Sequence, residues 1–318
     1  MPEPEAVPGP LIADLLSSWD LSLSDRQLSD RTREIYARTG RQLVRWLEEK
    51  GHPADTELID APHLRAFLGA EAARTSAVSA HQHYRNLRVL FRWLIAEGER
   101  TGPDPMARVG EPKVTAKVKP ILAGEQLAGL LATCQGQPVI GTRKMSVFEQ
   151  RRDEAVIRIF IDTGVRVEGM GAMLKDNVKL AHKTILIVLK GGDEHLIPLG
   201  RKAAAALDRY LRARARHKHA ASEWLWLGIA GLDPGHFGAA GIQDMLAKRG
   251  RAAGIEGLTP HWFRRTAAHM MLDAGMQEMD VARVAGWKST AMIRVYAGEL
   301  AQERARSAHA RLSPGDRL

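Results

Sequence analysis

Residues 184–199 read TILIVLKGGDEHLIPL, and they interrupt a chain whose apolar residues otherwise recur mostly at helical spacing. The run from Thr184 to Lys190 is rich in β-branched residues, which favour extended strands. Gly191-Gly192 separates it from a second apolar run at 195–198, and two such runs joined through glycine are typical of a β-hairpin. We therefore predict one small antiparallel sheet, with Lys190 at the hairpin turn.

Helical patterns flank this hairpin on both sides. Residues 123–133 and 147–162 precede it with helical periodicity, and residues 201–216 follow it with an alanine run and an Arg-rich end. The remainder to about Leu312 reads as helices broken by glycine-containing segments. Residues 120–318 are thus predicted to form a mainly α domain with a small antiparallel β-sheet.

A separate helical domain is predicted over residues 30–100. Asp30 is a good N-cap for a helix that runs to Lys50, and further helices are indicated after Asp60 and from Ser76 onward. The preceding residues, 1–29, read as a loose leader with one short helix around 11–19. Since little chain precedes Asp30, we expect no additional N-terminal domain.

Residues 101–119 differ in composition from both domains. They are rich in proline, glycine and lysine and have no apolar period, which is typical of an interdomain linker. With 318 residues, the chain also exceeds what one hydrophobic core usually supports. We therefore expect two domains joined by a basic linker.

The charge balance favours a polyanionic partner. The chain has 46 Lys and Arg against 37 Asp and Glu, a formal charge of +9, and its isoelectric point is near 9.8. On two predicted helices of the first domain, arginines recur at helical spacing. A solvated charged face explains one such row well, but two rows in one domain favour a surface that binds DNA phosphates. The candidate DNA-binding residues are Arg38, Arg41, Arg45, Arg85, Arg88 and Arg92.

Several classes of site and location are disfavoured. Cys134 is the only cysteine, so the chain can form no internal disulfide and no Cys-based zinc site, and we expect no metal or other cofactor. The histidine pairs His81/His83 and His217/His219 have no cysteine or carboxylate ligands beside them in the sequence, so neither pair predicts a metal site. No apolar run is long enough to span a bilayer and no signal peptide is evident, so a cytoplasmic location is expected.

The predicted C-terminal domain holds residues suited to phosphodiester chemistry. Cutting and resealing DNA without ATP requires a nucleophile that stores the bond energy as a covalent phosphoryl ester. Guanidinium pairs can bind the charged non-bridging oxygens, and a lysine or histidine can protonate the leaving oxygen. The candidate catalytic residues are Arg166, Lys190, His261, Arg264, Trp287 and Tyr296.

The order of these residues and the sequence around each of them resemble those of the tyrosine recombinases of the phage integrase family. Thr163-Gly164-Val165-Arg166 resembles the first family motif, and the Lys190 hairpin resembles the second. His261-Trp262-Phe263-Arg264 resembles the His-x-x-Arg box. Ala285-Gly286-Trp287-Lys288-Ser289 resembles the Leu-Gly-His-Ser-Ser segment, with Trp in the place of His. Tyr296 follows Trp287 by nine positions, the family's usual separation.

The resemblance implies a role for each matched residue. Arg166 and Arg264 would clamp the scissile phosphate, while His261 and Trp287 would donate to its oxygens. Lys190 would protonate the leaving 5′-oxygen, and Tyr296 would attack phosphorus to form a 3′-phosphotyrosyl ester. An indole donates but does not shuttle protons, so Trp287 would position the phosphate and not titrate.

One position departs from the family pattern. The family usually has an acidic residue three positions after the first arginine, where this chain has Gly169; Glu168 lies one position earlier. Either Glu168 supports the site through a shifted turn, or that support is absent.

The resemblance further implies an N-terminal helical, SAM-like core-binding domain and an α-rich catalytic domain that close on double-stranded DNA as a C-shaped clamp. It implies a homotetramer at synapsis, with the tail from Glu299 onward docking on a neighbour; an accessory protein that sets direction is left open. Two alternatives remain: a type IB-like topoisomerase, and a DNA-binding regulator whose catalysis has lapsed.

Overall fold

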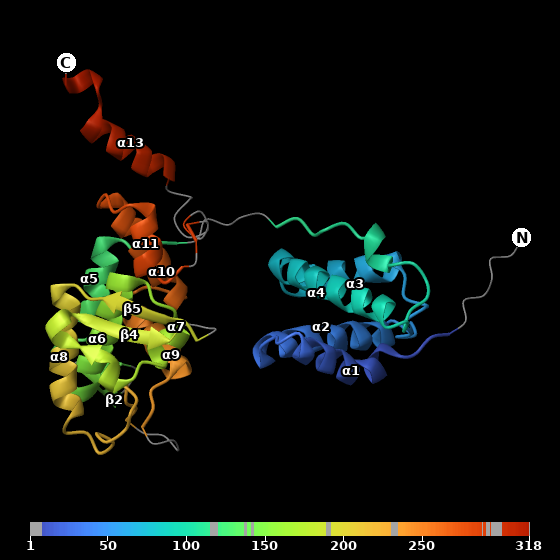
Figure 1. Cartoon of the computed structure of the whole chain (residues 1–318), viewed down its shortest axis with the longest axis horizontal. Helices are drawn as coiled ribbons and strands as arrows, with labels where there is room; N and C mark the ends of the chain where they lie inside the picture. The colour runs from blue at the N-terminus through green and yellow to red at the C-terminus, as the bar shows by residue number, and fades with distance from the viewer. Residues whose placement is uncertain are drawn as a thin grey trace, which may run out of the picture. The chain divides into compact units, whose positions relative to one another are not determined.

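The computed structural model describes residues 8–114, 120–136, 139–140, 143–188, 192–229, 235–287, 289–290, 293 and 301–317. The chain divides into two compact units, 1–117 and 118–318, whose boundary falls within the predicted linker. Each unit has its own hydrophobic core, and Figure 1 shows the helices and strands that form it.

The N-terminal unit is helical. Its elements are α1 (Ile12–Asp25), α2 (Asp30–Glu49), α3 (Ala61–Arg74), α4 (Ala77–Ala96) and the 3₁₀ turn η1 (Pro105–Arg108). Side chains of Ser29, Asp60 and Ser76 accept hydrogen bonds from the first-turn amides of α2, α3 and α4. Local capping therefore sets where these helices begin. The cap of α2 is Ser29, and Asp30 is its first helical residue.

The prediction of a loose leader over 1–29 was wrong for the part that the structure describes. Ile12, Trp19 and Leu23 of α1 are almost fully buried in the same core as α2, α3 and α4. The Trp19 ring stacks on Tyr36 with 5.8 Å between centroids. Apolar residues on one face of a helix need a partner surface, and α2 supplies it.

The first part of the predicted linker also belongs to this unit. Met106 and Val109, around η1, are buried in the N-terminal core. Arg100, directly before the predicted linker, is buried as well, and its Nη1 donates to the carbonyl of Ile59 at 3.1 Å. The composition of this segment predicted a linker because only a few of its residues are apolar. Those few are enough to pack its first part against the N-terminal core.

A buried polar network joins α2, α3 and α4. Arg74 Nε and Nη2 donate to the two Glu71 oxygens at 3.0 and 2.7 Å, and His83 Nε2 lies 3.4 Å from Glu71 Oε2. Thr39 of α2 lies 3.2 Å from His83 Nδ1 and accepts from the Asn86 amide at 2.8 Å. The hydrogen bond from Arg74 holds the pKa of the Glu71 carboxyl below its ordinary value, against the opposing effect of burial.

The C-terminal unit is mainly α, as predicted. Before the sheet lie α5 (Gly124–Ala132), the short strands β1 (Val139–Ile140) and β2 (Arg143–Lys144), α6 (Val147–Thr163), α7 (Val167–Gly171) and η2 (Lys175–Asn177). The sheet is followed by α8 (Arg201–Arg214), α9 (Ala239–Ala252), α10 (Pro260–Asp273), α11 (Glu278–Val284), α13 (Ala301–Leu312) and η5 (Gly315–Arg317).

The predicted hairpin is confirmed. Strand β4 (Thr184–Val188) pairs antiparallel with β5 (Glu194–Pro198), in a register from Thr184↔Pro198 to Val188↔Glu194. The structure adds a short strand, β3 (Val178–Lys179), followed by η3 (Leu180–His182), so the sheet order is β3-β4-β5. Ile185, Ile187 and Ile197 are buried in the core.

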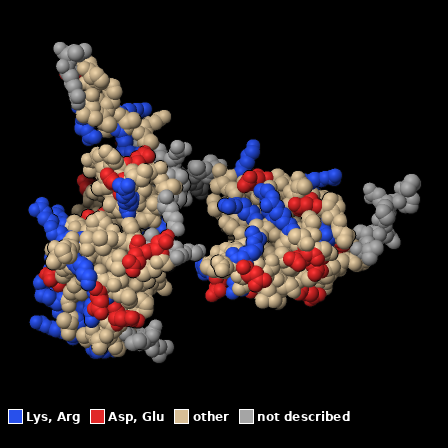
Figure 2. Space-filling view, viewed as in Figure 1, with Lys and Arg blue, Asp and Glu red and all other residues tan. Residues whose placement is uncertain are grey.

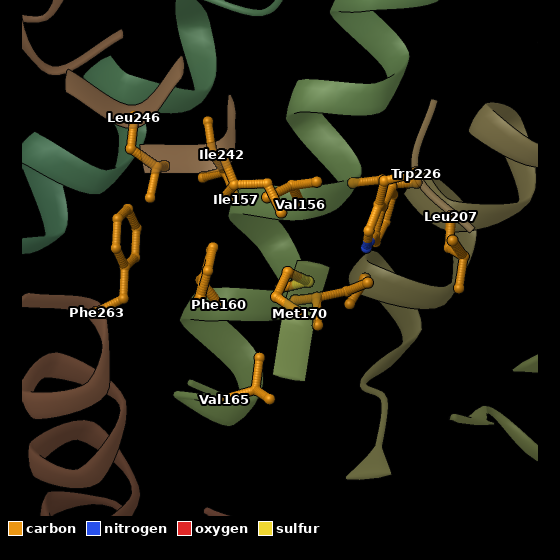
Figure 3. Packing of buried hydrophobic residues seen from close by; sticks show 14 of the residues in the cluster. Val156, Ile157, Phe160, Val165, Met170, Leu207, Trp226, Ile242, Leu246 and Phe263 are labelled. Atoms are coloured by element: carbon orange, nitrogen blue, oxygen red, sulfur yellow. The ribbon is translucent and has the colours of Figure 1, made fainter. Parts of the chain in front are cut away.

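Helix α6 runs through the middle of this unit. It packs against α8 and α10, and Val156, Ile157 and Phe160 on it are fully buried (Figure 3). The Phe160 and Phe263 rings stack with centroids 5.5 Å apart, which joins α6 to α10. In the part of the chain that the structure describes, no helix is long and apolar enough to cross a membrane.

The Glu71 network makes a pH-dependent prediction for Glu71→Gln. Because the folded-state pKa is lowered, ionised Glu71 stabilises the fold above its unfolded pKa, and this contribution disappears as pH falls through the folded pKa. At neutral pH we expect Glu71→Gln to lower the free energy of unfolding by about 1–3 kcal/mol. Urea denaturation should show this loss shrinking toward acid pH. The exposed Glu48 of α2 provides the control, and an equal loss for Glu71→Gln at every pH would contradict the prediction.

Candidate active site

The first arginine follows a sharp turn at the end of α6. Gly164 caps this helix in the left-handed conformation, with φ 59° and ψ 25°. Thr163 Oγ1 donates to the Ile159 carbonyl at 2.7 Å and accepts from the Val165 amide at 3.3 Å. Val165 then enters the core, whereas Arg166 is exposed at the N-cap of α7. The Thr-Gly-x-Arg motif therefore ends helix α6 at Gly164 and leaves the Arg166 side chain exposed.

The same turn touches the helix that carries the second arginine. A Cβ on Gly164 would lie 3.1 Å from Arg264 Cα and 3.2 Å from Ala267 Cβ, so the turn packs directly on the α10 backbone. Arg264 Nη1 donates to the Gly164 carbonyl at 2.6 Å. Two segments far apart in the sequence are thus held together at their arginines.

His261 and Arg264 lie one turn apart on α10, which starts at Pro260. Residues three apart share a helix face. Their exposure differs: His261 is exposed, whereas Arg264 is 2% exposed. Phe263, beside Arg264, is fully buried (Figure 3), so the core anchors the turn of helix that presents the guanidinium.

Trp287 lies behind Arg264. It is buried in a small cluster with Val281, Ala285 and Ile293, just after α11. The Arg264 guanidinium carbon is 4.9 Å from the indole centroid. A desolvated cation over an indole is stabilised by about 2 kcal/mol. The indole therefore supports the buried charge of Arg264.

Arg166, His261 and Arg264 line one pocket of about 630 Å³. Its walls come from the start of α7, from α9 and from the start of α10, and its lining also includes Val165, Val167, Glu168, Ala240, Gln243, Asp244, Ala247, Leu258, Thr259 and Pro260. The structure thus brings together three of the six predicted catalytic residues, with Trp287 packed against one of them. Lys190 and Tyr296 lie outside the described residues.

The strands of the hairpin contact two of the segments that carry candidate catalytic residues. A Cβ on Gly169 of α7 would lie 3.5 Å from Ile187 Cδ1, near the end of β4. On the facing strand, His195 Nε2 lies 3.3 Å from the Val284 carbonyl at the end of α11. The strands that flank Lys190 therefore contact both α7, which follows Arg166, and α11, which precedes Trp287.

The structure shows how Glu168 and Gly169 lie at the position where the family usually has an acidic residue. Glu168 is exposed and lines the pocket beside Arg166. A side chain at Gly169 would instead start in ordinary contact with Ile187 and Val165. The carboxylate on the pocket side of α7 is therefore that of Glu168.

Sequence reasoning missed the α9 wall. Ala240, Gln243, Asp244 and Ala247 recur at the spacing of one helical face, and all line the pocket. That spacing could have predicted that the four residues share one face of a helix. Only the packing of α7 on α9 shows that this face borders the arginines.

A pocket with two guanidinium groups and an imidazole suits an oxyanion such as a phosphodiester. Guanidinium groups bind phosphate oxygens through paired N–H donors, and low local dielectric strengthens the attraction. Gln243 and the carboxylates of Glu168 and Asp244 add polar groups at the wall.

Comparison with known proteins places this geometry in a family. The model of the phage integrase family matches residues 121–303, and that of the phage integrase N-terminal SAM-like domain matches residues 15–98. The chain belongs to the phage integrase family.

Relatives within this family are tyrosine recombinases. Tyrosine recombinase XerC of Corynebacterium efficiens is 30% identical over 255 residues, which cover 79% of this chain and 78% of the relative. Tyrosine recombinase XerD of Listeria monocytogenes is 26% identical over 277 residues, which cover 86% of this chain and 89% of the relative. This phage integrase family member is a tyrosine-type site-specific recombinase, and the predicted family and activity are confirmed.

Solved structures support the fold. The chain aligns with a lambda integrase dimer bound to a COC′ core site at a TM-score of 0.72 and 18% identity, covering 91% of this chain and 77% of that one. It aligns with XerH recombinase bound to a palindromic difH substrate at 0.71 and 18% identity, covering 89% and 81%. The predicted fold class, a SAM-like helical domain plus an α-rich domain with a small sheet, is confirmed.

The turn at Gly164 makes a prediction for Gly164→Ala. A left-handed alanine costs about 1–2 kcal/mol, and the contacts with Arg264 and Ala267 add about 1–3 kcal/mol. The matched control is Gly257→Ala, since Gly257 has φ 68° but a Cβ there would meet nothing within 4 Å. We expect Gly164→Ala to lose more unfolding free energy than Gly257→Ala and to slow DNA cleavage, which Gly257→Ala should spare. Equal effects of the two changes would contradict the proposed contact.

Proposed function

We propose that this recombinase cuts DNA by direct attack of Tyr296 on a phosphodiester held in the pocket of Arg166, His261 and Arg264. The Tyr296 oxygen forms a bond to phosphorus while the bond from phosphorus to the 5′-oxygen breaks, which leaves a 3′-phosphotyrosyl ester and a 5′-hydroxyl. The 5′-hydroxyl of a partner strand reverses the step and releases Tyr296. The bond energy is kept in the ester, so no ATP is required.

The observation that carries this proposal is the convergence of Arg166, His261 and Arg264 on one pocket. Negative charge grows on the non-bridging oxygens as the attack proceeds. Donors already oriented toward that charge lower the barrier without reorganising. Burial of Arg264 and its contacts with Gly164 and Trp287 support such pre-orientation.

Lys190 and Glu168 complete the proposed site. Lys190 protonates the leaving 5′-oxygen, since it follows β4, whose end approaches α7. Such a donor accelerates a reaction by about a hundred- to ten-thousandfold. Glu168 takes the supporting place of the family's acidic residue, since it lines the pocket beside Arg166.

The N-terminal unit is proposed to bind the same duplex, so that the two units close on it as a clamp. Thr39 and its partners His83 and Asn86 hold α2 against α4, the helices that carry the two arginine rows. In those rows every arginine is exposed except Arg88, which is half-buried near the Tyr84 ring. On the face of this unit that Figure 2 shows, several Lys and Arg side chains lie near one another, with Asp and Glu side chains beside them.

Recombination is proposed to take place in the cytoplasm within a tetramer on DNA, since two duplexes must each be cut on both strands. One similar structure is a lambda integrase tetramer bound to a Holliday junction. Helix α13 has no buried residue among those described. Ala301, Ala305, Ala308 and Leu312 follow one face of it, which suits docking on a neighbouring protomer.

The nucleophile is tested by Tyr296→Phe. Removing only the hydroxyl should leave DNA affinity unchanged and abolish the covalent adduct on a nicked suicide substrate, measured as a protein–DNA band that survives denaturation. An adduct formed by Tyr296→Phe would disprove the assignment. Absence of an adduct with the wild-type protein would favour the regulator alternative, and relaxation of any supercoiled DNA by wild type would favour the topoisomerase.

The arginine rows are tested by changing Arg85, Arg88 and Arg92 together to Gln. If they bind phosphates, DNA affinity should fall and the slope of log affinity against log salt should flatten by roughly one unit per lost contact. The matched control changes Arg26, Lys50 and Arg108, exposed cations outside the rows, to Gln. A slope equal to that of the control triple would restore the interpretation as a solvated charged face.

A further inference from the structure

His236, in the segment before α9, reaches the end of α7. Its Nε2 lies 2.8 Å from the Gly171 carbonyl oxygen. A carbonyl oxygen only accepts, so this hydrogen bond requires a proton on Nε2. The imidazole therefore donates to Gly171, the last residue of the helix that begins directly after Arg166.

The His236 ring is held from two sides. It stacks on Trp224 with centroids 4.1 Å apart and an interplanar angle of 19°. On another side, a Cβ on Gly238 would lie 3.1 Å from His236 Cε1, so the ring occupies the space that glycine leaves. Trp224 is itself attached to the chain after α7, through a bridge with Leu174 and the adjacent bond from the Leu225 amide to the Met173 carbonyl at 2.8 Å.

Helix α7 needs such outside support. It spans only Val167–Gly171, and a helix this short is not stable by itself. Its far end touches the start of α9 so closely that a Cβ on Gly171 would lie 2.5 Å from the Ala239 amide nitrogen. His236 thus joins the end of α7 to the segment that leads into α9, and both helices contribute residues to the pocket.

The direction of Arg166 depends on this backbone. Arg166 is exposed, and in the part of the chain that the structure describes its side chain forms no hydrogen bond or ion pair. Its position therefore follows from the Gly164 turn on one side and from α7 on the other. Because α7 follows Arg166 directly, a shift of α7 would move Arg166 relative to Arg264 and His261 on α10.

We propose that His236, stacked on Trp224, is a positioning residue that holds α7 against α9 and thereby aims Arg166 at the scissile phosphate. This inference rests on the proposed role of Arg166 as a phosphate clamp. His236 itself does not touch the DNA. Displacing a catalytic group by about 1 Å can cost about a hundredfold in rate, so loss of this hydrogen bond should be measurable.

The test uses His236→Phe, which keeps a ring to stack on Trp224 and removes the donor. Covalent adduct formation is timed on two suicide substrates, one with an ordinary scissile phosphodiester and one with a methylphosphonate, in which a methyl group replaces a charged non-bridging oxygen. A guanidinium clamp contributes less when that charge is absent. We expect His236→Phe to be about ten- to a hundredfold slower than wild type on the phosphodiester. On the methylphosphonate most of this deficit should vanish, as it should for Arg166→Ala.

Three controls accompany this comparison. His236→Gln retains a donor at similar reach and should recover part of the phosphodiester rate. His182→Phe changes an exposed histidine on η3 and should match wild type on both substrates. Lys190→Ala, whose proposed role is at the bridging oxygen, should keep its deficit on the methylphosphonate.

Two results would overturn the proposal: a wild-type rate for His236→Phe on the phosphodiester, or slowing by the same factor on both substrates, which marks a general structural defect. If His236→Phe does not fold, His236→Gln decides: it should be slower than wild type on the phosphodiester and lose most of that deficit on the methylphosphonate, whereas a wild-type rate or an equal deficit on both substrates would contradict the proposal. Failure of the proposed function is recognised separately, because wild type would then form no adduct on either substrate.

Discussion

The contact between the Gly164 turn and helix α10 is the constraint on which the candidate active site depends. Arg264 donates to the Gly164 carbonyl at 2.6 Å, and the missing side chain of Gly164 lets the α10 backbone come within van der Waals range. This one contact places the exposed Arg166 and the buried Arg264 on the same pocket, although their segments lie far apart along the chain. The neighbours of both arginines, Val165 and Phe263, are buried in the core, so neither guanidinium can move far without repacking.

The pocket wall formed by α9 is fixed by a different kind of interaction. Asp153, fully buried on α6, accepts from Arg152 at 2.8 and 2.9 Å and from Arg249 of α9 at 2.7 and 3.1 Å. Arg249 also donates to the Thr133 carbonyl at the end of α5. Buried ions are costly unless fully paired, and such a network tolerates few alternative arrangements. This network fixes α9 relative to α6 and to the end of α5.

The two units differ in how much of their organisation could be predicted from the sequence. In the N-terminal unit, Asp60 and Ser76 act as helix caps, so the starts of α3 and α4 follow from local hydrogen bonding. The burial of Trp19 and Met106 could not be predicted in that way, because isolated apolar residues in polar stretches acquire a partner only when the helices pack. In the C-terminal unit, β4 and β5 were evident from β-branched residues around Gly191-Gly192, whereas the strands β1, β2 and β3 are too short to give a pattern.

The sequence by itself determined the family and the hairpin, and it named Arg166, His261 and Arg264 as candidate site residues. Each of these features lies in a local motif: a glycine that ends a helix, a pair of strands, or a helix turn with His and Arg three residues apart. Only the tertiary structure decided which groups surround them. The α9 wall, the indole under Arg264 and the bond from His236 to Gly171 each join segments distant in the chain. Such contacts depend on how whole helices pack, and packing depends on the combined shape of many side chains, which no single stretch of sequence contains.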